Sequence, residues 1–455
     1  CLCTRAEENV ESYDAATLFL QSVRRLHRGF TLSGQTESQV GCLCRLVQGM
    51  PLALELAAPW ARMLSCAEMV HEIERDLDFL ARSGRDSLDR HHSIRAIFDH
   101  SWGMLSAEEQ RVLACLSVFR GGFGRAAAHQ VAGASLATLS ALVDKSLLCF
   151  NPLGRYDLHE LLRQYAFEWL GEMAEEKVST QERHSHYYLE FMRQQTHPLY
   201  SHRQGQALLE VLAEVDNVRA AWHWAVAHGQ ARELGRAVRS WSMFYDIQGW
   251  YQEGEIICRE TIDMLTRGGD GQEGEDNQNV EAERDRHIVL GQMLAAYGEM
   301  LLRSGSLGRS KALFQQSVTV LRQYDAPVEL ANTLFYAGSL AQQMGEYAEA
   351  KTLLQESLAL HQDCGDQRGV GLCLAVLGLT AGMVGNYAEA KTLMQQGADM
   401  LKMVGDPCYL AIVLNFLGNV MTATGELAAA KYLLEESLAI SRALGDRWNQ
   451  AFCLD

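Results

Sequence analysis

The sequence predicts a mainly α-helical protein, in which a helical domain and a winged helix precede an α-solenoid of stacked helical pairs. Only 6 of the 455 residues are prolines and 48% are hydrophobic, which suits long helices with buried cores. Apolar residues recur at the spacing of helical turns over most of the chain. In the last third, two series of glycines repeat every forty residues, which is the pattern of a stacked helical array.

Residues 1–92 are expected to be helical. Gly49 and Pro51 separate two predicted helices, because glycine is unfavourable inside a helix while proline is tolerated in a first turn, where its missing N–H would have no partner.

Residues 93–170 predict a winged-helix module. Ser106 and Glu109 form a capping-box sequence ahead of an apolar helix. A further helix is expected over residues 136–148, and a turn over residues 151–154 separates two short strands. Helices followed by such a hairpin are typical of a winged helix.

Residues 171–266 return to helical spacing and are expected to form an arm with degenerate repeats. The following segment, residues 267–287, contains seven acidic residues and no apolar stripe. Because such a composition cannot bury a core, we expect most of it to be a flexible acidic insertion.

Residues 288–455 carry the repeats, about four units of forty residues. One glycine series falls in the middle of the first predicted helix of each unit, and the other falls in the turn after it: Gly298, Gly338, Gly378 and Gly418, then Gly305, Gly345, Gly385 and Gly425. A glycine inside a helix costs about 1 kcal/mol relative to alanine, so we expect a neighbouring helix to approach closely there. Gly365 and Gly405 predict the ends of second helices.

These units resemble the tetratricopeptide repeat. The shared features are a small residue in the first helix, a Gly-x-Tyr turn such as that from Gly345 to Tyr347, and then Ala350 and Leu354. The period of forty exceeds the usual ~34 residues, which predicts longer helices. The resemblance implies a solenoid that presents a concave surface to a partner.

Taken in order, four phrases resemble the STAND class of signal-transduction ATPases, in particular bacterial regulators with a tetratricopeptide-repeat sensor. These phrases are GMPLALELAAPWARML, SIRAIFDHSWGMLSAEEQRVLACLSVFRGGF, LVDKSLL and RYDLHELLRQYA. The resemblance implies that residues 1–92 contain the end of a nucleotide-binding region and a helical domain, and that the repeats are the sensor. It also implies that ADP is held between the first domains in the resting protein.

Two residues would contact that nucleotide. Gly49-Met50-Pro51 matches the family's G-x-P motif, which assigns Pro51 to the adenine. Leu158-His159-Glu160 is similar to its Met-His-Asp motif, which assigns His159 to the β-phosphate. A neutral imidazole can donate one hydrogen bond to a phosphate oxygen. The alternative is that His159 only caps or braces the start of a helix.

The sequence lacks the phosphate-binding motif G-x-x-x-x-G-K-[ST] and contains no Gly-Lys dipeptide. We therefore expect that this chain does not hydrolyse ATP and that ADP or ATP belongs to the intact protein. The chain starts at Cys1 and stops where a further repeat would begin. We expect it to be truncated at both ends, without its nucleotide-binding and effector domains.

The inward positions of the first helices predict the partner site. They carry amides, hydroxyls and apolar groups but no lysine or arginine, so we expect an uncharged or apolar patch of a protein, or a small inducer, and no bare carboxylate. The residues are Asn332, Phe335, Ser339, Gln342, Gln343, Leu372, Leu379, Met383, Asn415, Asn419 and Thr422.

The main hypothesis is therefore a sensor and regulatory segment of a nucleotide-switched signalling protein. The alternatives are a DNA-binding transcriptional regulator that acts through the winged helix, and a plain protein-interaction scaffold. A net charge of −17 and a candidate recognition helix with one lysine and one aspartate disfavour nucleic acid. A hydrolase is disfavoured because no known catalytic motif occurs.

Twelve cysteines without paired metal-ligand spacing predict no metal site. No run of about 18 apolar residues occurs, so we expect no membrane partner. Reduced thiols and the lack of a secretion signal favour a cytoplasmic protein.

Overall fold

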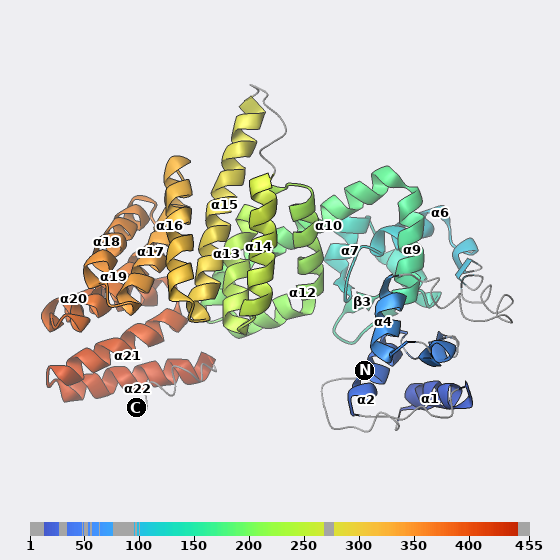
Figure 1. Ribbon diagram of the computed structural model, residues 1–455, viewed down its shortest axis with the longest axis horizontal. Coiled ribbons are helices and arrows are strands. Elements are labelled where there is room, and N and C mark those ends of the chain that lie inside the picture. The colour runs from blue at the N-terminus through green and yellow to red at the C-terminus, as the bar shows by residue number, and fades with distance from the viewer. Residues whose placement is uncertain are drawn as a thin grey trace. The chain divides into compact units, whose positions relative to one another are not determined.

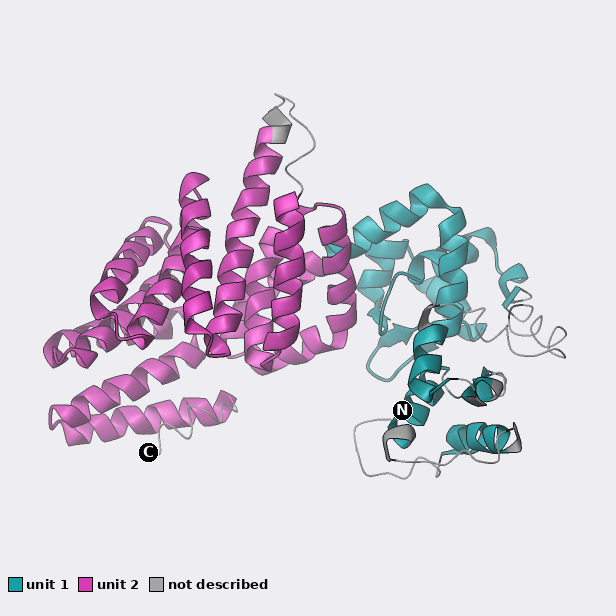
Figure 2. Cartoon of the chain, viewed as in Figure 1, with its two compact units in different colours: residues 1–187 teal, residues 188–455 magenta. Residues whose placement is uncertain are grey.

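The computed structural model describes residues 13–26, 34–47, 49, 53–54, 57–62, 64–75, 95, 98–99, 101–267 and 277–444. These residues belong to two compact units, residues 1–187 and residues 188–455 (Figure 2). Pro51 lies outside the described residues. Within the described ranges, no helix alone combines the length and apolar character of a membrane span. Only the bent pair of helices Arg125–Ala132 and Leu136–Asp144 passes that test together.

The first unit begins with short helices around one apolar core. Its elements are α1 (Asp14–Leu26), α2 (Gly34–Leu46), η2 (Ala58–Arg62) and α4 (Cys66–Arg75). The apolar faces of these helices meet in the interior, where Phe19, Leu43, Leu54 and Ile73 are fully buried. Helical spacing of apolar residues thus explains this part of the unit.

The rest of the first unit combines helices with a small antiparallel sheet. The elements are α6 (Ala107–Leu116), β1 (Phe123–Gly124), α7 (Arg125–Ala132), α8 (Leu136–Asp144), β2 (Cys149–Phe150), β3 (Arg155–Asp157) and α9 (Glu160–Glu172). Strand β3 lies between β1 and β2, and the predicted hairpin at residues 151–154 is present. The predicted capping box is also confirmed, since Ser106 and Glu109 exchange hydrogen bonds.

Helix α8 is shorter than predicted. It ends at Asp144 and not at residue 148, because Ser146 adopts a left-handed conformation with φ of 58°. This turn redirects the chain so that Leu147 and Leu148 enter the core ahead of β2. A periodicity argument could not find this end, since the residues stay apolar past it.

The second unit is a tetratricopeptide-like α-solenoid. After α10 (Ala174–Gln194), which runs into it from the first unit, the helices follow one another as pairs (Figure 1). They are α11 (Thr196–Tyr200), α12 (Gln204–Ala227), α13 (Ala231–Gln248), α14 (Tyr251–Arg267), α15 (Asn277–Arg303), α16 (Leu307–Gln323), α17 (Pro327–Gln343), α18 (Tyr347–Asp363), α19 (Gln367–Met383), α20 (Tyr387–Val404), α21 (Pro407–Ala423) and α22 (Leu427–Leu444).

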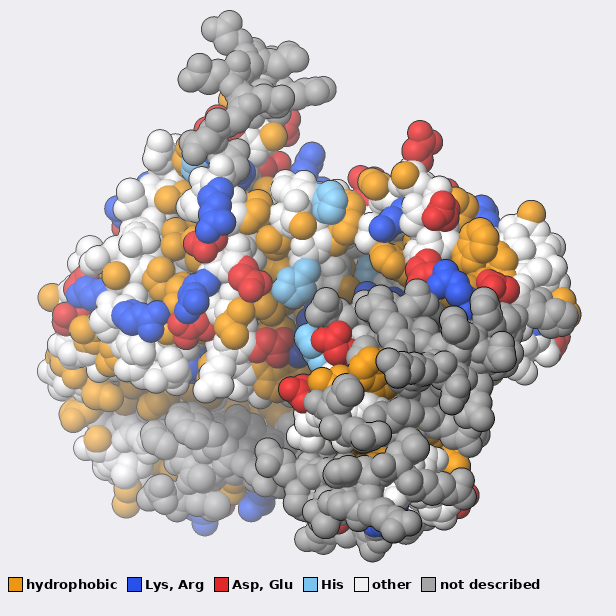
Figure 3. Space-filling model, turned by 45° about the vertical axis from the view of Figure 1, so that its right-hand side comes forward, with side chains coloured by type: hydrophobic (Ala, Val, Ile, Leu, Met, Phe, Trp, Pro, Cys, Tyr) orange, Lys and Arg blue, Asp and Glu red, His pale blue; other side chains and the backbone are white. Residues whose placement is uncertain are grey.

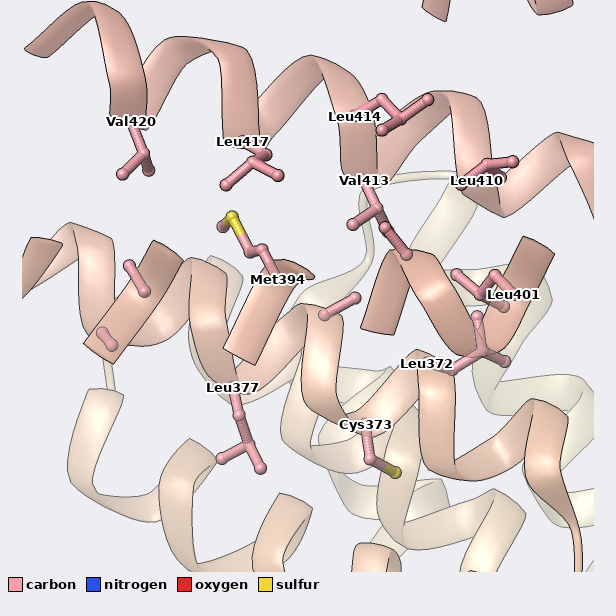
Figure 4. Packing of buried hydrophobic residues seen from close by; sticks show 14 of the residues in the cluster. Leu372, Cys373, Leu377, Met394, Leu401, Leu410, Val413, Leu414, Leu417 and Val420 are labelled. Carbon is pink, nitrogen blue, oxygen red and sulfur yellow. The ribbon is translucent and has the colours of Figure 1, made fainter. Parts of the chain in front are cut away.

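The mid-helix glycines allow the two helices of a pair to touch. A β-carbon at Gly338 would lie 2.7 Å from Cγ of Leu354, and one at Gly378 would lie 2.7 Å from Cγ of Met394. Both distances are too short for real atoms, so the predicted close approach is confirmed. Met394 belongs to the buried cluster that joins α19, α20 and α21 (Figure 4).

Serine side chains fasten the same pairs at a second point. The hydroxyls of Ser317, Ser357 and Ser437 donate to the carbonyls of Gly291, Ala331 and Ala411, at 2.6 to 2.7 Å. The equivalent residue of the third pair is Gly397, where a β-carbon would lie 2.8 Å from the Gly371 carbonyl oxygen. The third pair therefore replaces a hydrogen bond with direct backbone contact.

Exposed ion pairs link successive repeats at the forty-residue period. Nζ of Lys311 lies 2.6 Å from Glu346, and Nζ of Lys391 lies 2.7 Å from Glu426. Lys351 makes a longer pair with Glu389, at 3.5 Å. Because these pairs are solvent-exposed, water screens the attraction between their charges and each contributes little to stability.

The prediction of a flexible insertion over residues 267–287 is wrong for its second half. Helix α15 begins at Asn277, and Arg284 donates to the carbonyls of Tyr324 and Asp325. The ring of His287 stacks on that of Tyr324 at 4.3 Å. Carbonyls after the end of α16 thus hold a charged helical segment that has no apolar stripe of its own.

Candidate functional site

The predicted partner residues lie on the first helices α17, α19 and α21, with different exposure. Gln343, Met383, Asn419 and Thr422 are exposed, and Met383 keeps 55% of its surface accessible. Asn332, Ser339, Gln342 and Leu379 are half-buried. These eight residues can contact a partner.

Three predicted partner residues are buried and must be corrected. Phe335 and Leu372 belong to the hydrophobic cluster of α19 to α21, and Leu372 is labelled in Figure 4. Asn415 is fully buried and accepts a hydrogen bond from Asn419 at 3.2 Å. Neighbouring first helices pack against one another, which covers these positions. The repeat pattern identifies the helix face but cannot tell how far the next helix covers it.

Charged residues also converge on the side where the first helices meet, so the prediction of a site without arginine is wrong. Arg303 of α15 forms an ion pair with Asp246 of α13, in which Nε lies 2.9 Å from Oδ1 and Nη2 donates a hydrogen bond to Oδ2 at 3.1 Å. Arg303 also interacts electrostatically with Tyr336 of α17 and Tyr409 of α21. Groups from consecutive pairs can meet in this way only on the inner side of the solenoid. We call this set the inner polar cluster, namely Asp246, Glu299, Arg303, Tyr336, Arg368, Asp406 and Tyr409.

The repeat period contains the signal that would have revealed two of these residues. Glu299 and Arg303 lie forty residues before Ser339 and Gln343, so they occupy the same inward positions one unit earlier. The prediction started from Ala331 and left this unit out. Tyr336 and Arg368 follow no such rule, because they do not occupy the predicted inward positions.

Glu299 is the most perturbed acid of the cluster. It is only 6% exposed and accepts a hydrogen bond from Ser242 at 2.8 Å. Burial, and then the charge of Asp246, raises the pKa of Glu299 to about 7. One proton can therefore bind or leave near neutral pH at the point where α13, α15 and α17 meet.

Arg368 of α19 contacts a part of the same unit that is distant in sequence. Its Nε donates to Asp406 at 2.8 Å, and both side chains are buried. Its guanidinium lies 4.2 Å from the ring centroid of Tyr200 and 5.3 Å from that of Tyr409. Arg368 belongs to α19 of the third repeat, and Tyr200 belongs to α11, which precedes the first repeat. The contact therefore joins helices that are far apart in the sequence.

His159 braces the first unit. Its Nδ1 accepts from the N–H of Leu161, which caps α9, and its Nε2 lies 3.2 Å from the carbonyl oxygen of Val47. A carbonyl requires a donor, so the proton sits on Nε2 in the neutral ring. Burial lowers the pKa of His159, which favours this neutral form. The histidine thus ties the start of α9 to Val47, the residue that follows α2.

Two stretches of the solenoid match family models described as tetratricopeptide repeat, residues 329–403 and residues 410–446. They cover α17 to α22 almost completely. The sequence resemblance seen in the glycine and alanine positions is therefore confirmed for these repeats.

Curated relatives match parts of the chain. A Mycobacterium tuberculosis protein provisionally named an HTH-type transcriptional regulator is 34% identical over 230 residues, which is 48% of this chain and 26% of that protein. An uncharacterized protein of the same species is 33% identical over 173 residues, 36% of this chain and 44% of its own length. The matches thus span less than half of either relative.

Solved structures resemble the chain at low identity. A STAND protein with a tetratricopeptide repeat sensor from Pyrococcus horikoshii aligns with a TM-score of 0.31 and 14% identity, over 98% of this chain and 71% of that one. Aspartyl phosphate phosphatase F from Bacillus subtilis aligns with a TM-score of 0.40 and 10% identity, over 99% and 97% of the two chains.

Proposed function

We propose that this chain is the sensor and regulatory segment of a nucleotide-switched signalling protein of the STAND class. In this proposal the solenoid binds a protein or small-molecule inducer on its inner side, and the first unit helps to hold ADP in the intact protein. The convergence of side chains from consecutive repeats on one surface carries the proposal, because a plain scaffold has no need of it. The name of the mycobacterial relative supports a regulatory role.

The accessible inward residues define where the inducer would bind. Gln343, Met383, Asn419 and Thr422 offer amides, a hydroxyl and a flexible thioether, which suit a neutral or apolar patch. The sequence disfavoured an acidic ligand because the predicted site contained no cation. Arg303 keeps 43% of its side chain exposed, so an acidic group could reach one positive charge here. The pairing of Arg303 with Asp246 still leaves an acidic ligand in competition with a resident carboxylate.

Nucleotide binding would involve the region that His159 braces. In the present arrangement the Nε2 proton of His159 is directed at the Val47 carbonyl. The imidazole therefore does not offer a donor to a phosphate unless that contact opens. Since the chain has no phosphate-binding loop of its own, the proposal includes no ATP hydrolysis by this segment.

Two exposed methionines provide a direct test of the inducer surface. Met383 lies at an inward position of α19, whereas Met403 lies on the second helix α20 and is 75% exposed. We expect a partner captured with this chain to protect Met383 from oxidation by hydrogen peroxide at least threefold, with little change at Met403. Mass spectrometry of the two peptides measures both residues in one sample. Equal protection of the two methionines, or protection of Met403 alone, would rule out the inner surface as the site.

DNA binding through the winged helix is the second candidate, and the relative's name is the observation that favours it. The candidate recognition helix α8 is followed by Lys145, whose Nζ is held by both carboxylate oxygens of Glu109 at 2.7 and 2.8 Å. On the described part of the face in Figure 3, basic and acidic side chains are interspersed. A DNA backbone needs clustered positive charge, so these observations favour the sensor role.

A further inference from the structure

A cavity of about 280 Å³ lies in the second unit, between helices α16, α17 and α18. Its lining comes from the second helices of two successive repeats and from the first helix that lies between them in the chain. None of the predicted inward residues of α17 lines it, so the cavity is separate from the inner side. The apolar part of the lining consists of Phe314, Val318, Ala337, Leu340, Ala341 and Leu353.

The repeat period explains why a cavity forms here. Ala337 stands where the two following repeats have Leu377 and Leu417 and where the preceding one has Tyr297. Both leucines are buried, and Leu377 belongs to the apolar cluster shown in Figure 4. Because Ala337 is much smaller, it leaves the space that a leucine side chain fills in the later repeats.

Ion pairs between α16 and the region of α18 lie at the two ends of this cavity. Lys311, which lines it, is bound by Glu346 and Glu349 at 2.6 and 2.8 Å. Arg322, which also lines it, is bound by both carboxylate oxygens of Glu356 at 2.6 and 2.8 Å. Lys311 and Arg322 are about three helical turns apart on α16, and the apolar lining lies between them.

The chemistry of the lining favours a neutral apolar ligand. An anion would compete with the carboxylates that already hold Lys311 and Arg322, and a cation would be repelled by these two residues. An apolar group against Phe314 and Leu340 would leave water without breaking either ion pair. For scale, an apolar cavity of roughly 150 Å³ in another protein holds benzene, so this one has room for two fused rings.

We infer that this cavity is a binding site for a small neutral apolar molecule of about the size of a two-ring aromatic compound. Ala337 provides the room, and Phe314, Val318 and Leu353 provide the apolar contacts. The inference goes beyond the proposed function, because it adds a second ligand site away from the inner surface. A ligand here would contact two successive repeats and so stabilise the interface between them.

Equilibrium dialysis of the 455-residue chain with naphthalene tests the inference. We expect one naphthalene to bind per chain, and Ala337→Leu to weaken the binding at least tenfold, because the new side chain fills the cavity as Leu377 fills its place in the next repeat. The matched control is Ala388→Leu, which adds the same group at an exposed position of α20, outside the cavity lining. The control should bind naphthalene as the wild type does, and circular dichroism should show both variants folded.

Two further measurements separate ligand binding from damage to the fold. Val318→Leu copies Leu358 of the next repeat and gives the same test with a smaller change, should Ala337→Leu not fold. The wild type should bind 2-naphthoate, which adds a carboxylate to the same rings, at least tenfold more weakly than naphthalene. The inference is overturned if naphthalene does not bind, if the folded variants retain wild-type affinity, or if 2-naphthoate binds more tightly. The oxidation of Met383 tests the inner surface independently of these results.

Discussion

At the scale of single residues, Glu299 shows how position changes chemistry. An exposed glutamate would be charged at pH 7, but this one lies among three inner helices. Burial, and then the charge of Asp246, favours its protonated form, although the hydrogen bond from Ser242 favours the charged form. Because the folded protein binds this proton more tightly than the unfolded chain, the carboxyl stabilises the fold fully at pH values below about 4.5. That contribution is lost as the pH rises to about 7.

Glu299→Gln should therefore remove a pH dependence. We expect the variant and the wild type to have similar free energies of unfolding at pH 5, and the variant to be more stable by up to about 3 kcal/mol at pH 8. Urea denaturation of both proteins at several pH values measures the difference. His159, with its lowered pKa, makes both proteins more stable as the pH rises. This effect cancels when the two proteins are compared at the same pH. A constant difference from pH 5 to pH 8 would show that Glu299 does not titrate in this range.

At the scale of helices, the stacking within a pair depends on glycines whose surroundings differ. A β-carbon at Gly378 would lie 2.7 Å from Cγ of Met394 and 3.0 Å from the carbonyl oxygen of Ala390. In the same helix, a β-carbon at Gly382 would meet nothing closer than 3.6 Å. One helix therefore contains both a crowded glycine and an uncrowded one.

Alanine at these two positions should have opposite effects. Gly382→Ala should stabilise the solenoid by about 1 kcal/mol, because alanine favours helix and finds room. Gly378→Ala should destabilise it by about 1 to 3 kcal/mol, because the helices must move apart. Denaturation midpoints of the two variants, each compared with that of the wild type, show whether each substitution raises or lowers the stability. If both substitutions stabilise the protein, the close packing of α19 on α20 is not real.

Much of the solenoid could be predicted from sequence because its interactions recur. Gly338 and Ala350 mark close packing that follows from one period, and the family matches agree. The inner site was predicted less well, because its key contacts are not periodic. Arg368 reaches Tyr200 across 168 positions, and Asn415 is fully buried although it lies at a predicted inward position. Such contacts depend on how tightly the array is wound, which a single repeat does not encode.

At the scale of the whole second unit, the contact between Arg368 and Tyr200 joins parts that a simple solenoid would keep apart. Solenoids normally unfold as a sum of neighbouring interfaces. A contact between α11 and α19 adds an interaction energy between helices that are not neighbours. Loosening one of these helices should therefore destabilise the other.

Tyr200→Leu should expose this coupling. We expect amide hydrogen exchange at the start of α19 to accelerate about fivefold, since a cation–π contact of this kind is worth roughly 1 kcal/mol. Tyr432→Leu is the matched control, because Tyr432 is an exposed tyrosine on α22. Its exchange at α19 should equal that of the wild type. Unchanged exchange in Tyr200→Leu would mean that the ring contact does not hold the two regions together.

The same contact also bears on how fast a ligand can come and go. A groove open along its length admits a partner from the side, at a rate set by diffusion. If the proposed inducer is extended and lies along the inner side, it would have to pass the contact between Tyr200 of α11 and Arg368 of α19. The residence time of a bound inducer would then depend on how often Tyr200 and Arg368 separate, as well as on the affinity of the inducer. A weakly bound inducer would thus remain on the protein for some time after its free concentration has fallen.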